Sequence, residues 1–230
     1  MIDMALLRNL SLFNEVAEDL LQRVAYEAHI RSFTAGHYVL FQGDTGDALY
    51  LILHGTVKVF LNLADGSEVF LALLGTGDVF GEMSLIDASG RSANVLTREN
   101  TQLLIMEQSL FNHLLDRSPS FGRNMLRLLA RRLRMTNARI RAHCTLDIYG
   151  MVAFQLLEFA DLYGEKYSDG TVYIPVRLTQ TDLAQLVGAS RERVNQVMVA
   201  YRKTKILKVD SDYRITIYKP EELRKRTLQS

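Results

Sequence analysis

Residues 80–93 read FGEMSLIDASGRSA, the stretch of this 230-residue chain whose order of residue types is most informative. Gly81 lets the backbone pass close to a bound molecule, because glycine has no side chain and tolerates a positive φ. The residues after it predict one short helical turn, whose free backbone N–H groups attract an anion. Arg91 and Ser92 then return a guanidinium and a hydroxyl, and the planar fork of an arginine matches phosphate oxygens. The segment therefore predicts a turn that binds a phosphate.

Glu82 is the unexpected member of this segment, because a carboxylate beside a phosphate is repelled unless it accepts a hydrogen bond from the ligand. A ribose 2′-hydroxyl would supply that bond. Each piece alone has an ordinary explanation, since a Gly-Glu pair forms a turn and a single arginine is solvated at the surface. In this order, the residues predict a ligand that carries both a phosphate and a sugar hydroxyl.

Short apolar runs separated by glycines surround the segment, from about residue 33 to residue 108. Nine of the fourteen glycines lie between residues 36 and 90, which is typical of a compact β-barrel or jelly roll with tight turns. Ahead of it, apolar residues near helical spacing predict short helices over 6–29. The expected strands include 39–41, 49–52, 57–60 and 69–73.

The order of residues in 80–93 resembles the phosphate-binding cassette of the cyclic nucleotide-binding domain, as found in the CRP/FNR family of bacterial regulators. Met83 stands where that family usually has a smaller or branched apolar residue. Residues 43–52, which read GDTGDALYLI, resemble the turn and strand of the same β-roll. The resemblance covers residues 6–219.

A long helix is predicted over 119–143, with Ser118 as its N-cap and Pro119 in its first turn. An apolar seam recurs along it at alternating steps of three and four residues, which is the spacing of a coiled coil. Such a seam either packs on the chain's own barrel or pairs with a second copy, and the narrow stripe flanked by arginines favours the homodimer. In the family this helix is the dimer spine. The seam consists of Leu126, Leu129, Leu133, Thr136 and Ile140.

Beyond a boundary near 142–146, Asp147 is expected to cap a helix that runs to about Tyr163, and 207–217 to form a β-hairpin. The chain is thus expected to have an α+β fold: a nucleotide-binding β-roll over 1–117, a dimerisation helix and hinge over 118–146, and a winged helix-turn-helix over 147–230.

The second motif spans 178–197 and reads LTQTDLAQLVGASRERVNQV. Thr179 and Asp182 form a capping pair for one short helix, Gly188 permits a sharp turn, and Ser190 caps the next helix. An ordinary helical hairpin would share this pattern, but it would not need charged side chains at the start of the second helix. The spacing therefore predicts a helix-turn-helix.

Arg191 and Glu192 begin that second helix, where side chains project into a major groove of DNA. Arginine reads guanine, and glutamate accepts from the amino group of cytosine. Gln196 replaces an arginine that is common in the family, so one base of the expected TGTGA-like half-site is open. The resemblance implies that the DNA contacts are Thr179, Gln180, Ser190, Arg191, Glu192 and Gln196.

The resemblance also implies cyclic AMP as the ligand, although cyclic GMP stays open because the choice of base rests on two residues, Thr136 and Asn137. It assigns the phosphate and ribose to Gly81, Glu82, Met83, Ser84, Arg91 and Ser92. It places Arg132, Thr136 and Asn137 over the base, and Val57 and Leu71 along the wall of the pocket. Base contact is expected to extend and lock the helix through 140–146.

The distribution of charge agrees with a ligand domain followed by a nucleic-acid-binding region. The net charge of +1 divides into −8 over 1–117, +7 over 118–146 and +2 over 147–230. No apolar run is long enough for a membrane span, and the start lacks the pattern of a signal peptide. The single cysteine, Cys144, fits the reducing cytoplasm. RNA polymerase is a further partner that the family implies.

Other classes of protein remain as alternatives. A constitutive regulator of the same fold would not respond to nucleotide. An iron–sulfur sensor needs several cysteines, and a haem sensor needs axial ligands, whereas the five histidines are scattered. An enzyme acting on nucleotides would need a metal-ligand cluster or a nucleophile–base pair, and neither occurs at a recognisable spacing. We therefore expect no catalysis and no metal.

Overall fold

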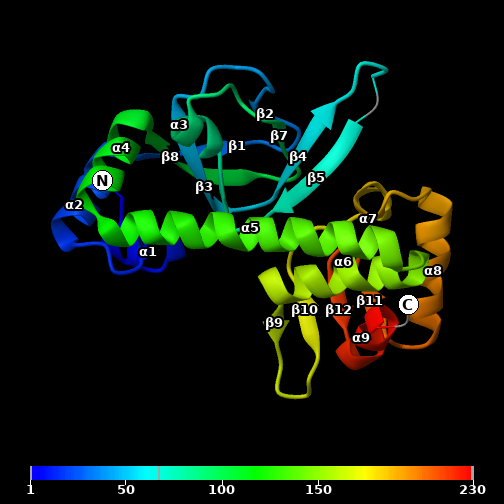
Figure 1. Ribbon diagram of the computed structural model, residues 1–230. Helices are drawn as coiled ribbons and strands as arrows, with labels where there is room; N and C mark the ends of the chain where they lie inside the picture. Colours follow the sequence, from blue (N-terminus) through cyan, green and yellow to red (C-terminus); the bar gives the residue numbers. More distant parts are fainter. Residues whose placement is uncertain (1, 67, 229–230) are drawn as a thin grey trace. The chain divides into compact units, whose positions relative to one another are not determined.

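The computed structural model describes residues 2–66 and 68–228, and its chain divides into two compact units (Figure 1). The first unit ends at Arg134 and the second begins at Met135, so the division falls inside the long helix α5, Pro119–Thr145. The fold is α+β, with a β-rich first unit and a helix-turn-helix in the second.

The first unit is built on two four-stranded antiparallel sheets. Their strand orders are β1-β8-β3-β6 and β2-β7-β4-β5, so neighbours in space are distant in sequence, as in a jelly roll. The strands are β1 His29–Phe33, β2 Tyr38–Leu40, β3 Ala48–His54, β4 Val57–Asn62, β5 Glu68–Leu74, β6 Val79–Phe80, β7 Asn94–Thr97 and β8 Thr101–Glu107. The expected strands are confirmed, and β1 starts within what the spacing predicts to be helix.

Alternation along the strands creates two cores, because successive side chains point to opposite faces of a sheet. On β8, Leu103 and Ile105 join residues of both sheets in one cluster, which includes Val57 and Phe80. Leu104 on the other face joins a second cluster with the helices. The sheet that contains β3 and β8 is therefore buried on both faces, which fixes β6 and the turn that follows it.

The helices of the second cluster come from both ends of the first unit. The expected helical region 6–29 consists of α1 Met4–Arg8, the 3-10 turn Ser11–Phe13 and α2 Glu18–Glu27. The later helices are α3 Met83–Asp87, α4 Gln108–Arg117 and the beginning of α5. Phe121 of α5 is fully buried and packs edge-on against Phe111 of α4, with ring centroids 5.8 Å apart.

The helix α5 begins where the sequence predicts, since the Ser118 hydroxyl accepts from the N–H of Phe121 at 3.2 Å. Its seam is not covered by the chain's own barrel: Leu126, Leu133 and Ile140 are 68%, 63% and 59% exposed. The helix is continuous to Thr145. Residues 140–145 are therefore helical in this structure, and the expectation that base contact extends and locks the helix through 140–146 stays a prediction.

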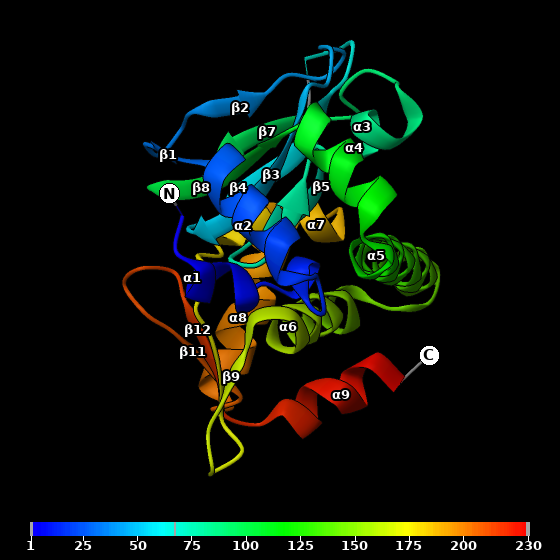
Figure 2. The ribbon, with the colours of Figure 1, turned by 90° about the vertical axis from the view of Figure 1, so that its left-hand side faces the viewer.

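The second unit contains the rest of α5, four further helices and a small sheet of order β11-β12-β10-β9. Asp147 caps α6 through the N–H of Gly150 at 2.8 Å, as expected, and α9 packs along α6 (Figure 2). The elements are α6 Ile148–Tyr163, β9 Glu165–Lys166, β10 Val172–Ile174, α7 Gln180–Val187, α8 Arg191–Lys203, β11 Leu207–Val209, β12 Ile215–Ile217 and α9 Pro220–Leu228. Across 2–66 and 68–228, no helix has the length and apolar character of a membrane span.

Candidate anion site and nucleic-acid interface

The turn after β6 has the conformation that the sequence predicts. Gly81 adopts φ +79°, and α3 starts two residues later at Met83. A Cβ atom on Gly81 would lie 2.8 Å from Nη1 of Arg91 and 3.1 Å from the carbonyl oxygen of Ala48. Both the positive φ and the close approach therefore require glycine at this position.

Arg91 is buried at the centre of this turn, with 4% of the residue exposed. Its Nη1 donates to the carbonyl oxygen of Gly81 at 2.7 Å and to the hydroxyl of Ser84 at 2.9 Å. Its Nη2 lies 3.4 Å from a carboxylate oxygen of Asp47, which is itself largely exposed. The Nε–H is buried with no hydrogen-bond partner among the described residues. A cation with one unsatisfied donor inside a tight turn suits an anionic ligand.

Glu82 is the second buried charge of the site, with 2% of the residue exposed. Its Oε1 accepts from Nη1 of Arg132 at 2.6 Å, and Arg132 also donates to the carbonyl oxygen of Val79. One arginine of α5 is thus bonded both to the turn and to the strand before it. The pair leaves Oε2 of Glu82 to accept from another donor, such as a sugar hydroxyl.

Of the remaining cassette residues, Met83 and Ser92 are exposed and Ser84 is buried. Met83 is about half exposed, and the hydroxyl of Ser92 lies 3.7 Å from its sulfur. Ser84 is buried and engaged with Arg91. The structure therefore brings Gly81, Glu82, Ser84, Arg91 and Arg132 together as one bonded group, with Met83 and Ser92 at its rim.

The two residues expected to wall the pocket differ in their surroundings. Val57 is fully buried in the core between the sheets, whereas Leu71 on β5 is 39% exposed.

Tyr50 is an aromatic residue that the sequence interpretation did not select. Its ring stacks on Phe80 at 5.1 Å between centroids, and the guanidinium of Arg91 lies 5.8 Å from its centroid. Burial raises the pKa of the Tyr50 hydroxyl.

Sequence reasoning also missed the role of Gly46 and Asp47 in holding the site. A Cβ on Gly46 would lie 2.1 Å from the Ser84 hydroxyl, so the loop before β3 packs directly on α3. Asp47 supplies the carboxylate nearest to Arg91. The motif in residues 43–52 was recognisable, but its contact with residues 40 positions later is visible only in the fold.

Thr136 and Asn137, expected to face the base, lie exposed on α5 within the second unit. They follow Arg132 by about one helical turn. That end of α5 is fixed within its own unit, because Arg139 donates from Nε to both carboxylate oxygens of Glu158 on α6, at 3.0 and 3.1 Å. The Gln155 amide donates to the same carboxylate at 2.8 Å.

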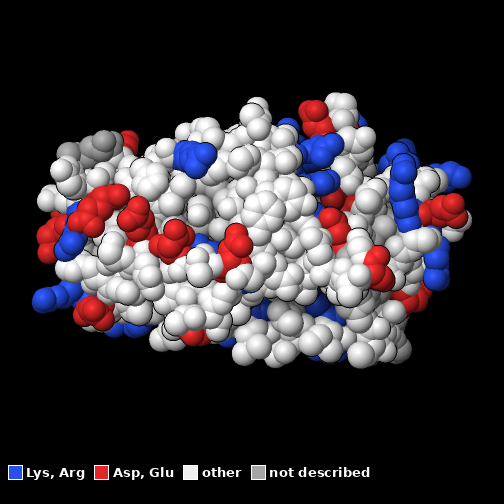
Figure 3. Space-filling model, turned by 90° about the horizontal axis from the view of Figure 1, so that it is seen from above, with Lys and Arg blue, Asp and Glu red and all other residues white. Residues whose placement is uncertain are grey.

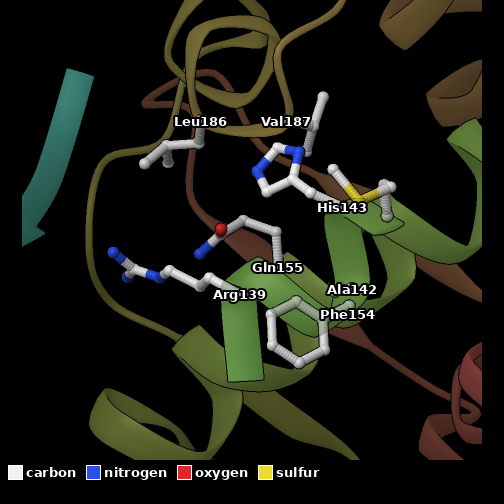
Figure 4. Close-up of a pocket in the computed structure, with 8 residues that line it drawn as sticks. Arg139, Ala142, His143, Phe154, Gln155, Leu186 and Val187 are labelled. Carbon is white, nitrogen blue, oxygen red and sulfur yellow. The ribbon is translucent and has the colours of Figure 1, made fainter. Parts of the chain in front are cut away.

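Figure 4 shows the small cavity beside this ion pair, where side chains of α5, α6 and α7 meet. Its volume is about 10 Å³, room for at most one water molecule. His143, Leu186 and Val187 close it on the side of α7. This region therefore joins helices rather than binding a ligand.

The helix-turn-helix forms with the caps that the sequence predicts. Thr179 and Asp182 make a reciprocal capping box at α7, with the N–H of Asp182 3.2 Å from the Thr179 hydroxyl. Gly188 ends α7 with φ +65°, and the Ser190 hydroxyl accepts from the N–H of Arg193 at 3.3 Å. The hydroxyl of Thr179 is thus already engaged in capping.

The first two turns of α8 expose the residues expected to read bases. Arg191, Glu192 and Gln196 are exposed, while Val194 and Val197 on the same helix are buried. Gln180 of α7 donates to the amide oxygen of Asn195 at 2.9 Å, which joins the two helices. Figure 3 shows lysine and arginine side chains gathered at the α8 end of the second unit, as a polyanion would require.

Within the described part of the chain, no group of three or more His, Cys, Asp or Glu side chains has a metal-binding arrangement. Cys144 is a free, exposed thiol.

Known proteins resemble both parts of the chain. Residues 30–118 match the family model "Cyclic nucleotide-binding domain", and residues 152–226 match "Crp-like helix-turn-helix domain". A CRP-like cAMP-activated global transcriptional regulator of Mycobacterium tuberculosis is 37% identical over 74% of this chain and 75% of its own. The catabolite activator protein of Thermus thermophilus is 29% identical, with a TM-score of 0.52, over 95% of this chain and 98% of its own.

A third relative shares the fold at lower identity. The c-di-GMP-responsive global regulator CLP of Xanthomonas campestris is 22% identical, with a TM-score of 0.65, over 88% of this chain and 99% of its own. These similar proteins are transcription regulators rather than enzymes.

Proposed function

Because this chain belongs to the CRP/FNR family of transcription regulators, we propose that it is a homodimeric DNA-binding regulator gated by cyclic AMP. The nature of the ligand is inferred from the bonded group around Arg91 and Glu82. It combines a buried cation with an unsatisfied Nε–H and a buried carboxylate with a free oxygen. Those groups suit a cyclic phosphate next to a ribose 2′-hydroxyl.

The coupling to DNA runs through α5 in this proposal. Glu82 contacts both the ribose and Arg132, so sugar binding biases the helix to which Arg132 belongs. Thr136 and Asn137 add contacts to the base, with Asn137 coming from the partner subunit. Base contact locks the helix through 140–146, and the locked helix sets the orientation of the second unit.

The free energy available from the ligand is sufficient for such a switch. A nucleotide moves the equilibrium only as far as it prefers the active arrangement. A 100-fold preference supplies about 2.7 kcal/mol per site and about 5.5 kcal/mol per dimer, which inverts a 1:99 population. The two recognition helices then sit about 34 Å apart, one turn of DNA.

The dimer is proposed from the exposed seam of α5. Leu133→Glu places a charge at the centre of this stripe, and we expect the dimer dissociation constant to rise at least 100-fold. Sedimentation velocity measures the change. Arg131→Glu, also exposed on α5, is the matched control and should leave the dimer intact. A Leu133→Glu variant that stays dimeric would contradict the seam as the interface.

The proposed function is tested by fluorescence anisotropy at fixed salt with a palindromic TGTGA-N6-TCACA duplex. Tight binding only with cyclic AMP supports gating and the choice of adenine together. Equal binding with cyclic AMP, with cyclic GMP and without nucleotide would instead identify a constitutive regulator. A regulator that binds operators works in the cytoplasm with RNA polymerase as its further partner, so the same assay extends to polymerase recruitment.

A further inference from the structure

An open groove in the second unit lies apart from both proposed sites. Its volume is about 580 Å³, within the range of ligand-binding pockets. The lining residues are Arg202, Lys205, Leu207, Lys208 and Tyr218. They come from the end of α8, the turn after it, β11 and the residue after β12.

Three of these five residues are positively charged, and their side chains make no bond within the described fold. The side chains of Arg202, Lys205 and Lys208 are exposed and have no hydrogen-bond or ion-pair partner in the part of the chain that the structure describes. Leu207 is buried at the back, and Tyr218 is about half exposed. Cations around an apolar and aromatic centre form a typical binding surface, since arginine and tyrosine are enriched in interface hot spots.

The backbone of the groove is also unusual. Lys205 adopts φ +54°, a conformation that glycine favours at the end of a helix. The N–H of Ile206 donates to the carbonyl oxygen of Tyr201 at 2.9 Å, which closes the end of α8. Lys205 thus occupies a position where glycine would be less strained, and it adds a positive charge to the lining of the groove.

The groove lies at the end of the unit that does not face DNA in the proposed function. Arg202 is near the C-terminal end of α8, whereas Arg191 begins it, so the two lie about 17 Å apart along the helix. Leu207 pairs with Ile217 at the base of the hairpin. In Figure 2 the loop of the β11–β12 hairpin projects from the opposite end to that from which α9 leaves.

We propose that this groove binds an acidic peptide segment of a partner protein, with carboxylates on the three cations and an apolar side chain on Leu207 and Tyr218. Charge complementarity selects the class of partner. A concave groove around an aromatic side chain matches an extended peptide better than the convex backbone of duplex DNA. This inference rests on the helix-turn-helix part of the proposed function and is independent of the nucleotide.

The test is anisotropy of a fluorescein-labelled peptide, Gly-Asp-Asp-Phe-Leu-Asp-Asp-Gly, with the full-length protein. The control peptide replaces each Asp by Asn. We expect saturable binding of the acidic peptide, at least tenfold tighter than the control, and weakening as salt increases. Binding of both peptides with equal affinity would overturn the proposal.

Variants locate the binding within the protein. Lys205→Gly with Lys208→Gln removes two charges, and glycine suits the positive φ, so the fold is retained. Acidic-peptide affinity should fall at least tenfold while operator affinity stays within twofold. The matched control, Lys166→Gln with Lys225→Gln, changes two exposed lysines outside the groove.

Two outcomes of these experiments contradict the proposal in different ways. If the groove variant loses operator affinity instead, the groove belongs to the DNA interface. If a mononucleotide such as ATP displaces the peptide with micromolar affinity, the site is for a small anion. Failure of the proposed function is a separate result, in which the unsubstituted protein does not bind the operator with or without nucleotide.

Discussion

In the first unit Arg91 and Glu82 of the ligand site are buried and hydrogen-bonded within the fold, whereas in the second unit Arg191 and Glu192 lie exposed without partners of that kind. Arg91 already donates to Gly81 and Ser84. A nucleotide must therefore exchange or extend existing bonds, while DNA meets a surface that is already formed.

This difference indicates which property each site controls. When a ligand exchanges hydrogen bonds in a buried site, other elements bonded to the same residues are affected as well. Here that element is α5, because its Arg132 donates to Glu82. An exposed surface contributes affinity only when its whole unit is oriented correctly. The first site is thus suited to switching and the second to reading.

Arg91→Gln is expected to have the largest effect, because it removes the buried cation bonded to Gly81 and Ser84 while keeping amide donors. We expect cyclic AMP affinity to fall at least 100-fold, about 2.7 kcal/mol, since charge-assisted bonds to phosphate are lost. Isothermal titration calorimetry measures the affinity. Because Arg91 is buried, unfolding should also become easier by about 1–3 kcal/mol, so a urea titration accompanies it. Unchanged nucleotide affinity would contradict the site.

Arg191→Ala tests the exposed side of the comparison. We expect the free energy of operator binding to weaken by about 1–3 kcal/mol, roughly a 5- to 150-fold loss of affinity, with relaxed preference at one base pair. Nucleotide affinity and stability should not change, because the side chain is exposed. The control Arg193→Ala should weaken operator and random duplexes alike. If Arg191→Ala behaved in that same way, it would contact phosphate rather than a base.

Arg132→Ala separates binding from coupling. Glu82 keeps its place and one free oxygen, so cyclic AMP affinity should fall less than tenfold. The ratio of operator affinities with and without nucleotide should fall about tenfold, within the usual range of allosteric coupling. The exposed neighbour Arg131, changed to Ala, should alter neither quantity. An unchanged ratio would show that coupling bypasses the Glu82–Arg132 pair.

Gly188→Ala is expected to have the smallest effect. Its φ is +65°, but the nearest atom to an added Cβ is His143 Cε1 at 3.7 Å, so strain is confined to the backbone. The cost should be about 1 kcal/mol, a fall of a few degrees in the Tm of the second unit. Gly81→Ala adds a steric clash to the same backbone strain and should cost more. Equal falls in Tm for the two variants, measured by calorimetry, would contradict the expected difference between the buried and the exposed site.

Much of this architecture could be predicted from local sequence signals. The capping box at Thr179, the turn at Gly188 and the cap at Asp147 depend on residues three or four apart, and each is confirmed. The helical turn after Gly81 is confirmed for the same reason. Strand β1 was missed because its residues lie in a polar stretch that gains its partner only from β8, about 70 residues later.

The sequence predicted part of the membership of the candidate site but not its bonding. A cassette motif identifies Glu82, Arg91 and Arg132 by resemblance, yet the ion pair of Glu82 with Arg132 joins residues fifty apart. Gly46 shows the same limit, since only the fold brings it against Ser84. Side-chain pairing across elements depends on tertiary placement, which local periodicity does not encode.

The division of the chain inside α5 has a consequence for how the switch could be observed. In a continuous helix each N–H donates to the carbonyl oxygen four residues earlier. Only about four of these hydrogen bonds cross the boundary between residues 134 and 135, and their donors are the amides of 135–138. Two of those amides belong to Thr136 and Asn137. Their hydrogen–deuterium exchange rates therefore report directly on the joint, and slowing on nucleotide addition would register the transition one peptide group at a time.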